Sequence, residues 1–223
     1  MSKTAIIIGS TGLTGSHLLQ ILLDSKEYNS VISFVRKPSN IKHTKLIEHV
    51  IDFDKPDSYR HLVKGDDFFC CLGTTIKKAG SQEAFRRVDY VYPTKFAEIA
   101  AKNGVKQFLI ITAIGSNAQS KTFYIRTKGE CEESLKNYDF KTVAIFRPSI
   151  LEGNRQEFRL GEKAGIYLMK IFSFFLFGKM RKYRSIDSKK VAFAMYAVAQ
   201  QNKEGYLIYE SDEISDIFAR RNI

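Results

Sequence analysis

The chain has 223 residues and a net charge of +11, with 44% hydrophobic and 26% charged residues. This length supports one large domain with a complete core, and the composition excludes disordered, collagen-like and coiled-coil proteins. The positive charge admits nucleic acid, an acidic membrane or an anionic small molecule as a partner. Because the excess divides evenly between the two halves of the chain, it argues against a separate polyanion-binding domain.

The three cysteines, Cys70, Cys71 and Cys131, are odd in number and contain no CxxC pair. They therefore indicate neither a disulfide framework nor a zinc site, and we expect no metal. The first apolar run, residues 5–8, is too short for a signal peptide. No stretch reaches the roughly 18 apolar residues of a membrane-spanning helix, so we expect a cytoplasmic protein.

Short apolar runs rich in Val, Ile and Phe alternate with helix-like stretches, which is typical of strands buried on both faces of a sheet. The runs are residues 5–8, 31–35, 46–51, 68–72, 108–112, 142–146 and 206–209. Helices between successive strands imply right-handed crossovers and a parallel sheet. We predict an α/β fold with one Rossmann-type, doubly wound parallel sheet over residues 1–223 and a small substrate cap around residues 150–190.

A glycine-rich loop follows the first predicted strand and opens the first predicted helix. It reads Gly9, Ser10, Thr11, Gly12, Leu13, Thr14 and Gly15. In such a GxxGxxG loop the glycines permit a tight turn, close backbone approach to a pyrophosphate and close packing of the helix on the strand. The phosphates then meet free N–H groups at the positive end of the helix dipole. The alternative is a tight strand–helix turn without a ligand.

The end of the second predicted strand distinguishes NADP(H) from NAD(H). NAD(H) sites usually carry an Asp or Glu there, whereas this chain carries Arg36 and Lys37, and Arg forms paired hydrogen bonds with a 2′-phosphate. NADP(H) is therefore favoured, against the alternative of two solvated surface cations. After the third strand, Asp52 and Phe53 are candidates for adenine binding. A turn or helix-capping role for Asp52 is equally compatible with the sequence.

Tyr124 and Lys128 form a YxxxK pair, which places both side chains on one face of a helix. A nearby ammonium lowers the pKa of a phenol, so the pair suits proton transfer to a carbonyl oxygen. Lys128 is also a candidate for binding the nicotinamide ribose. The pattern is common by chance, and its weight comes from its position after the strand at 108–112. Thr112, with Ser116 behind it, is the candidate hydroxyl for the substrate oxygen, although a capping or turn role fits both hydroxyls equally.

These features together resemble the atypical short-chain dehydrogenase/reductases, and in particular the Tat-interacting protein-like branch of NAD(P)H-binding oxidoreductases. The segments that carry the resemblance are CLGTT at 71–75, KAGS at 78–81, FRRVDY at 85–90, FYIRTKGE at 123–130, FRP at 146–148 and NRQE at 154–157. The resemblance implies that Leu72, Gly73 and Thr74 line the cofactor and that Pro148 lies near the nicotinamide. Thr112 stands where the wider superfamily has serine, and Asp89 and Tyr90 stand where its extended members have an asparagine.

A basic and apolar segment at residues 163–190 has no role in this scheme. Its apolar part is nearly uniform around a helix, which favours burial in the core or in a subunit contact of a homo-oligomer. A helix lying on an acidic membrane is the second interpretation. Nucleic-acid binding has charge in its favour but no motif.

Three functions remain open from the sequence. The first is an NADP(H)-dependent oxidoreductase that transfers hydride to or from a small carbonyl or alcohol substrate. The second is a non-catalytic NADP(H)-sensing or partner-binding protein, because members of the related branch also act as regulators. The third is a protein that associates with a membrane or with nucleic acid through residues 163–190.

Overall fold

The computed structural model describes residues 3–153 and 178–222. Its central sheet has seven parallel strands in the order β3-β2-β1-β4-β5-β6-β9. They are β1 (Lys3–Ile8), β2 (Tyr28–Val35), β3 (Leu46–Val50), β4 (Asp67–Cys70), β5 (Gln107–Ile111), β6 (Thr142–Arg147) and β9 (Gly205–Glu210). All seven predicted strands are present, and the predicted Rossmann-type fold is confirmed.

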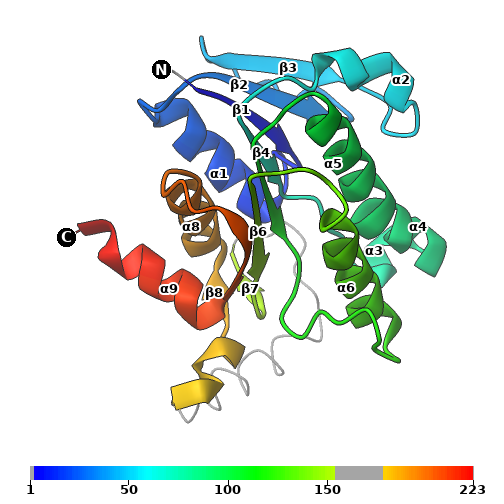
Figure 1. The fold of residues 1–223 in the computed structure, drawn as a ribbon, viewed down its shortest axis with the longest axis vertical. Coiled ribbons are helices and arrows are strands. Elements are labelled where there is room, and N and C mark those ends of the chain that lie inside the picture. The colour runs from blue at the N-terminus through cyan, green and yellow to red at the C-terminus, as the bar shows by residue number, and fades with distance from the viewer. Residues whose placement is uncertain (1–2, 154–177, 223) are drawn as a thin grey trace.

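Helices cover both faces of the sheet (Figure 1). One face carries α1 (Leu13–Asp24), α8 (Ser188–Ala199) and α9 (Ser211–Ala219). The other face carries α5 (Tyr92–Lys102) and α6 (Phe123–Leu135). The shorter helical elements of the described residues are α2 (Pro56–Tyr59), α3 (Ile76–Ala79), α4 (Gln82–Arg86), a π-helical turn (Arg87–Val91) and three 3-10 turns (Arg60–Leu62, Gly178–Tyr183 and Arg220–Asn222). Two strands of two residues, β7 (Leu151–Glu152) and β8 (Ile186–Asp187), pair with each other.

Alternation along β1 explains why the sheet needs two helical layers. Ala5 and Ile7 pack into the core beneath α1 and α8, whereas Ile6 and Ile8 pack into the core beneath α5 and α6. Successive strand residues point to opposite faces, and all four of these side chains are fully buried. A strand that is apolar at every position is therefore stable only between two layers.

The strand order places the reversal of the winding between β1 and β4. Ligands of open α/β sheets bind at the carboxyl ends of the strands beside this reversal. The loops that matter for binding are therefore those after β1, β4, β5 and β6.

The predicted cap around residues 150–190 and the basic apolar segment at 163–190 fall mainly on residues 154–177, outside the described part of the chain. The cap remains a prediction. Within the described residues, no helix combines the length and the apolar character needed to cross a membrane.

Candidate cofactor and catalytic site

The glycine loop is packed so tightly that side chains are excluded at two of its positions. Gly9 has a φ of +78°, in the left-handed region that favours glycine, and a Cβ there would press on the carbonyl group of Cys71 after β4. A Cβ on Gly15 would collide with the carbonyl oxygen of Gly9. The Gly12 N–H donates to the same oxygen over 3.0 Å and closes the turn. The first turn of α1 therefore lies directly against the end of β1.

Two hydroxyl groups of this loop have different surroundings. The buried Ser10 hydroxyl lies 2.7 Å from the hydroxyl of Ser33 in β2, which fixes the loop to the neighbouring strand. The Thr14 Oγ1 is buried and finds no hydrogen-bond partner among the described residues. Gly12 is the N-cap residue of α1, and no side chain caps the helix there. An uncapped helix N-terminus with a spare hydroxyl suits a phosphate group.

The segment after β4 connects the glycine loop to α6. The Cys71 carbonyl lies against Gly9, and two residues later a Cβ on Gly73 would lie 3.7 Å from Asp89 Oδ1 and 3.8 Å from Lys128 Nζ. The Thr74 N–H donates to Asp89 Oδ2 over 3.0 Å. The structure thus brings residues 72–74 and Lys128 into one continuous site with the glycine loop.

Lys128 is buried, and its ammonium forms an ion pair with Asp89, with 2.6 Å between Nζ and Oδ1. Burial acts to lower the pKa of Lys128, but the charges of Asp89 and Tyr124 outweigh it and raise the pKa above the ordinary lysine value. Tyr124 is partly buried, and its ring packs on that of Phe85 with 5.4 Å between the ring centroids. The predicted Tyr–Lys pair therefore shares one face of α6, beside the end of β4.

The two candidate substrate hydroxyls are already hydrogen-bonded within the protein. Thr112 Oγ1 donates to Glu132 Oε1 over 2.6 Å, and the Ser116 hydroxyl donates to the Ala113 carbonyl over 2.7 Å. Both side chains are buried. This geometry supports the structural interpretation of both hydroxyls, and a substrate contact by Thr112 stays a prediction.

Glu132 also pairs with Arg147 at the end of β6. Arg147 Nε lies 3.1 Å and 3.2 Å from the two carboxylate oxygens, and Nη2 makes a further contact with Oε2. The hydrogen bonds with Glu132 raise the pKa of Arg147 although its burial opposes this. Bidentate pairing of this kind is strong and directional, so it fixes α6 on β6.

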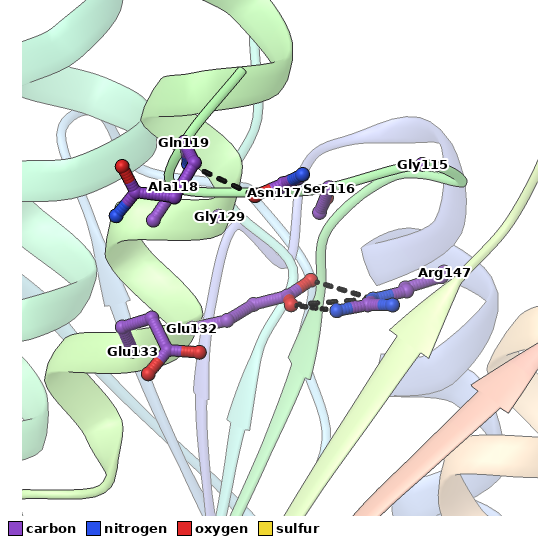
Figure 2. A pocket seen from close by; sticks show the side chains of 9 residues that line it. All are labelled: Gly115, Ser116, Asn117, Ala118, Gln119, Gly129, Glu132, Glu133 and Arg147. Atoms are coloured by element: carbon purple, nitrogen blue, oxygen red, sulfur yellow. Dashed lines mark hydrogen bonds and ion pairs between the residues drawn. The ribbon is translucent and has the colours of Figure 1, made fainter.

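This ion pair borders a cavity of about 480 Å³ between α6 and the loop at residues 115–119. Figure 2 shows the Glu132 side chain extending from α6 to Arg147, with the loop passing over them. On the helix side, a Cβ at Gly129 would collide with the backbone of Asn117 and Ala118. The loop and α6 are thus in direct backbone contact beside the cavity.

The predicted phosphate-binding cations, Arg36 and Lys37, follow directly after β2, which is the neighbour of β1 in the sheet. Both are exposed, and no carboxylate among the described residues is paired with either of them. They are therefore available to an anion beside the glycine loop.

The other predicted cofactor contacts are engaged locally. Asp52 accepts the Asp54 N–H over 3.0 Å, and the Phe53 ring is buried edge-on against Tyr92. This geometry favours a turn role for Asp52 and a core role for Phe53, so adenine binding by either stays a prediction. Pro148 is buried after β6, at the same edge of the sheet as the glycine loop.

Three residues of this site, Asp89, Glu132 and Arg147, carry no role that a sequence motif predicts. Glu132 follows Lys128 by four residues, so its place on the same face of α6 was available from helical spacing. Its partner Arg147 lies on a different strand, and the partner of Lys128 lies 39 positions earlier in the sequence. Neither pairing follows from a local pattern.

The sequence matches a protein family described as NAD(P)H-binding over residues 9–167. That range begins at the first glycine of the loop and includes the Tyr124–Lys128 pair and Pro148. The chain belongs to this NAD(P)H-binding family.

Curated relatives of this NAD(P)H-binding chain confirm the resemblance to the atypical short-chain dehydrogenase/reductases. It is 36% identical over 165 residues to Protein HTATIP2 of Rattus norvegicus, which covers 72% of this chain and 68% of that protein. It is 40% identical over 164 residues to Protein FMP52-2, mitochondrial, of Scheffersomyces stipitis, with 71% of each chain covered.

Solved structures with the same fold include enzymes that act on nucleotide sugars. A UDP-N-acetylglucosamine 4-epimerase from Methanobrevibacter ruminantium M1 superposes with a TM-score of 0.71 at 18% identity, covering 98% of this chain and 80% of that one. The Bordetella bronchiseptica enzyme WbmH in complex with NAD+ gives a TM-score of 0.71 at 15% identity, with the same coverage. At these identities the similarity establishes the fold.

We predict that Glu132→Gln lowers the free energy of unfolding by roughly 3 kcal/mol, because it leaves the half-buried Arg147 without a compensating charge. Urea denaturation measures this. Glu133→Gln is the matched control, because Glu133 is the next residue of α6 and its carboxylate is exposed. It should change the free energy of unfolding by less than about 0.5 kcal/mol. Equal stability of the two variants would show that the Glu132–Arg147 pair does not hold α6 on the sheet.

Proposed function

We propose that the chain is an NADP(H)-dependent oxidoreductase that transfers hydride to or from a small carbonyl or alcohol substrate. The observation that carries the proposal is the continuity of the site. The glycine loop touches the segment after β4, and Asp89 joins that segment to the Lys128 side chain of α6. A cofactor that extends along this edge of the sheet connects a phosphate-binding helix N-terminus to a Tyr–Lys pair.

The described residues offer partners for the phosphates and for the nicotinamide half of a dinucleotide. The uncapped N-terminus of α1 and the free Thr14 hydroxyl would bind the pyrophosphate. The exposed Arg36 and Lys37 would bind the 2′-phosphate. Residues 72–74 would line the middle of the cofactor, with Lys128 at its ribose and Pro148 near its nicotinamide.

In this proposal the bound cofactor supplies or accepts the hydride. For carbonyl reduction, the Tyr124 phenol donates its proton to the substrate oxygen as that oxygen gains negative charge. The Lys128 ammonium stabilises the phenolate that remains on Tyr124. The reverse reaction uses the same phenolate as the base that takes the proton from the alcohol.

A non-catalytic NADP(H)-binding regulator is the second candidate, and one observation favours it. The Thr112 hydroxyl donates to the buried Glu132 and the Ser116 hydroxyl donates to a backbone carbonyl, so neither is free for a substrate oxygen. This candidate predicts tight NADPH binding without turnover on a panel of aldehydes, ketones and quinones.

The cofactor preference is tested by calorimetry with NADPH and NADH. We expect NADPH to bind more tightly than NADH. We expect Arg36→Ala to weaken NADPH binding by about 10- to 100-fold, because a charge-assisted hydrogen bond to the 2′-phosphate is lost. NADH binding should not change. Arg220→Ala removes an exposed arginine beyond α9 and is the control. Absence of binding of either cofactor to the wild-type chain would contradict the whole proposal.

The proton donor is tested with Tyr124→Phe. We expect kcat for NADPH oxidation with the best substrate of the panel to fall by about 10²- to 10⁴-fold, because general acid catalysis is lost. NADPH affinity should stay the same. Tyr138→Phe removes a hydroxyl from a residue beyond the far end of α6 and should leave both quantities unchanged. Full activity of Tyr124→Phe would remove Tyr124 from the mechanism.

We propose a cytoplasmic location for the chain. The yeast relative FMP52-2 carries the word mitochondrial in its name, and that description applies to the yeast protein. Cell fractionation with antibody detection distinguishes the two locations, and recovery of the protein in washed mitochondria would contradict the cytoplasmic assignment.

A further inference from the structure

Asp89 lies between two parts of the proposed site. It belongs to the π-helical turn Arg87–Val91, which continues directly into α5. One carboxylate oxygen lies 2.6 Å from Lys128 Nζ, and the other accepts the Thr74 N–H over 3.0 Å. Turns of this kind interrupt helices frequently at functional sites. A single carboxylate thus joins α6 to the segment that lines the proposed cofactor site.

The burial of this pair makes its charge state important. The Lys128 side chain is 6% exposed and that of Asp89 is fully buried. An isolated lysine at such a depth loses its proton easily, because low dielectric surroundings disfavour the charged form. An oppositely charged carboxylate in direct contact is what keeps a buried ammonium charged.

The other titratable groups around Lys128 do not replace Asp89. Cys70 of β4 and Cys131 of α6 face it, and burial raises the pKa of both thiols, so they stay neutral. Tyr124 faces it from the preceding turn of α6 and is the phenol that the proposed reaction uses. Glu132, one turn later, is engaged by Arg147 and Thr112.

We propose that Asp89 is a positioning residue of this site: its carboxylate holds the Lys128 side chain as a permanent ammonium ion and ties it to the backbone at Thr74. The role in turnover rests on the proposed function, whereas the control of the Lys128 charge does not. Asp89 acts through Lys128 and does not itself transfer a proton.

One chemical consequence follows for Tyr124. While Asp89 is ionised, an ammonium is present beside the phenol throughout the neutral and mildly alkaline range. Without the carboxylate, burial favours neutral Lys128, and the phenolate of Tyr124 loses its stabilising partner. The site would then need a higher pH to form the phenolate.

The direct test follows the titration of Lys128 by NMR in protein labelled with ¹³C at the lysine Cε. The Lys128 signal is assigned by its absence in Lys128→Met. In the wild-type chain we expect the signal to stay unchanged up to the ordinary lysine pKa. In Asp89→Asn, which keeps an oxygen for the Thr74 N–H, we expect the midpoint to fall below that value. Asp89→Glu restores a carboxylate and should return the midpoint above it.

Asp67→Asn is the matched control. Asp67 is another buried carboxylate paired with a lysine, Lys3, and it accepts a hydrogen bond from Tyr28, but it lies at the first residue of β4, at the opposite edge of the sheet from the site. This variant should leave the Lys128 titration unchanged. An unchanged Lys128 midpoint in Asp89→Asn overturns the proposal. If Asp89→Asn does not fold, the wild-type titration still decides, because a midpoint below the ordinary lysine value contradicts a permanent ammonium.

NADPH calorimetry on the wild-type chain separates this inference from the proposed function. If NADPH binds and the Lys128 midpoint is the same in Asp89→Asn as in the wild-type chain, the role of Asp89 is overturned and the proposed function is not. A shifted titration without NADPH binding supports the control of Lys128 by Asp89 and overturns the proposed function. Where turnover is measurable, the rate of alcohol oxidation should begin to rise at a higher pH in Asp89→Asn than in the wild-type chain. Asp67→Asn should not change this pH dependence.

Discussion

The site depends on a backbone contact that leaves no room for a Cβ atom. The Gly9 turn lies against the carbonyl group of Cys71, and Gly15 brings α1 against the carbonyl oxygen of Gly9. Three segments from β1, β4 and α1 meet there, and the helix N-terminus is left at the reversal of the sheet winding. Close backbone packing with an uncapped helix end is the physical requirement for holding a pyrophosphate by N–H groups.

Buried charges then fix α6 relative to this centre. Lys128 pairs with Asp89, and Glu132, one turn later on the same face of the helix, pairs with Arg147 of β6. Each pair would be costly with one partner missing, so both favour one rotation and one height of the helix on the sheet. Tyr124 lies one turn before Lys128 on α6, so the same contacts position it.

The parts of the structure that were predictable from the sequence are those encoded locally. Runs of buried aliphatic residues define the strands, and glycines at fixed spacing after β1 define the loop, because both depend on backbone geometry over a few residues. The hydrogen-bond partner of the Thr112 hydroxyl is not encoded locally. It depends on Glu132, 20 residues later, and that contact exists only because β5 and α6 are packed together.

The same limit applies to Phe53 and Asp89. Phe53 follows β3, where the sequence predicts contact with an adenine ring, but its ring packs against aromatic side chains of α5 instead. Asp89 stands in the sequence where extended members of the superfamily have an asparagine. Its contact with Lys128 depends on the packing of two helical segments that are far apart in the sequence. A polar residue at a sheet edge thus indicates a site, and the tertiary packing decides which atoms remain free.

Gly129 allows the loop at residues 115–119 to lie directly on α6. Because the backbone of Asn117 and Ala118 occupies the space of the missing side chain, the loop and the helix share one surface without an intervening layer. A side chain at this position would have to separate the loop from α6, and the loop and the helix both line the cavity beside the Glu132–Arg147 pair.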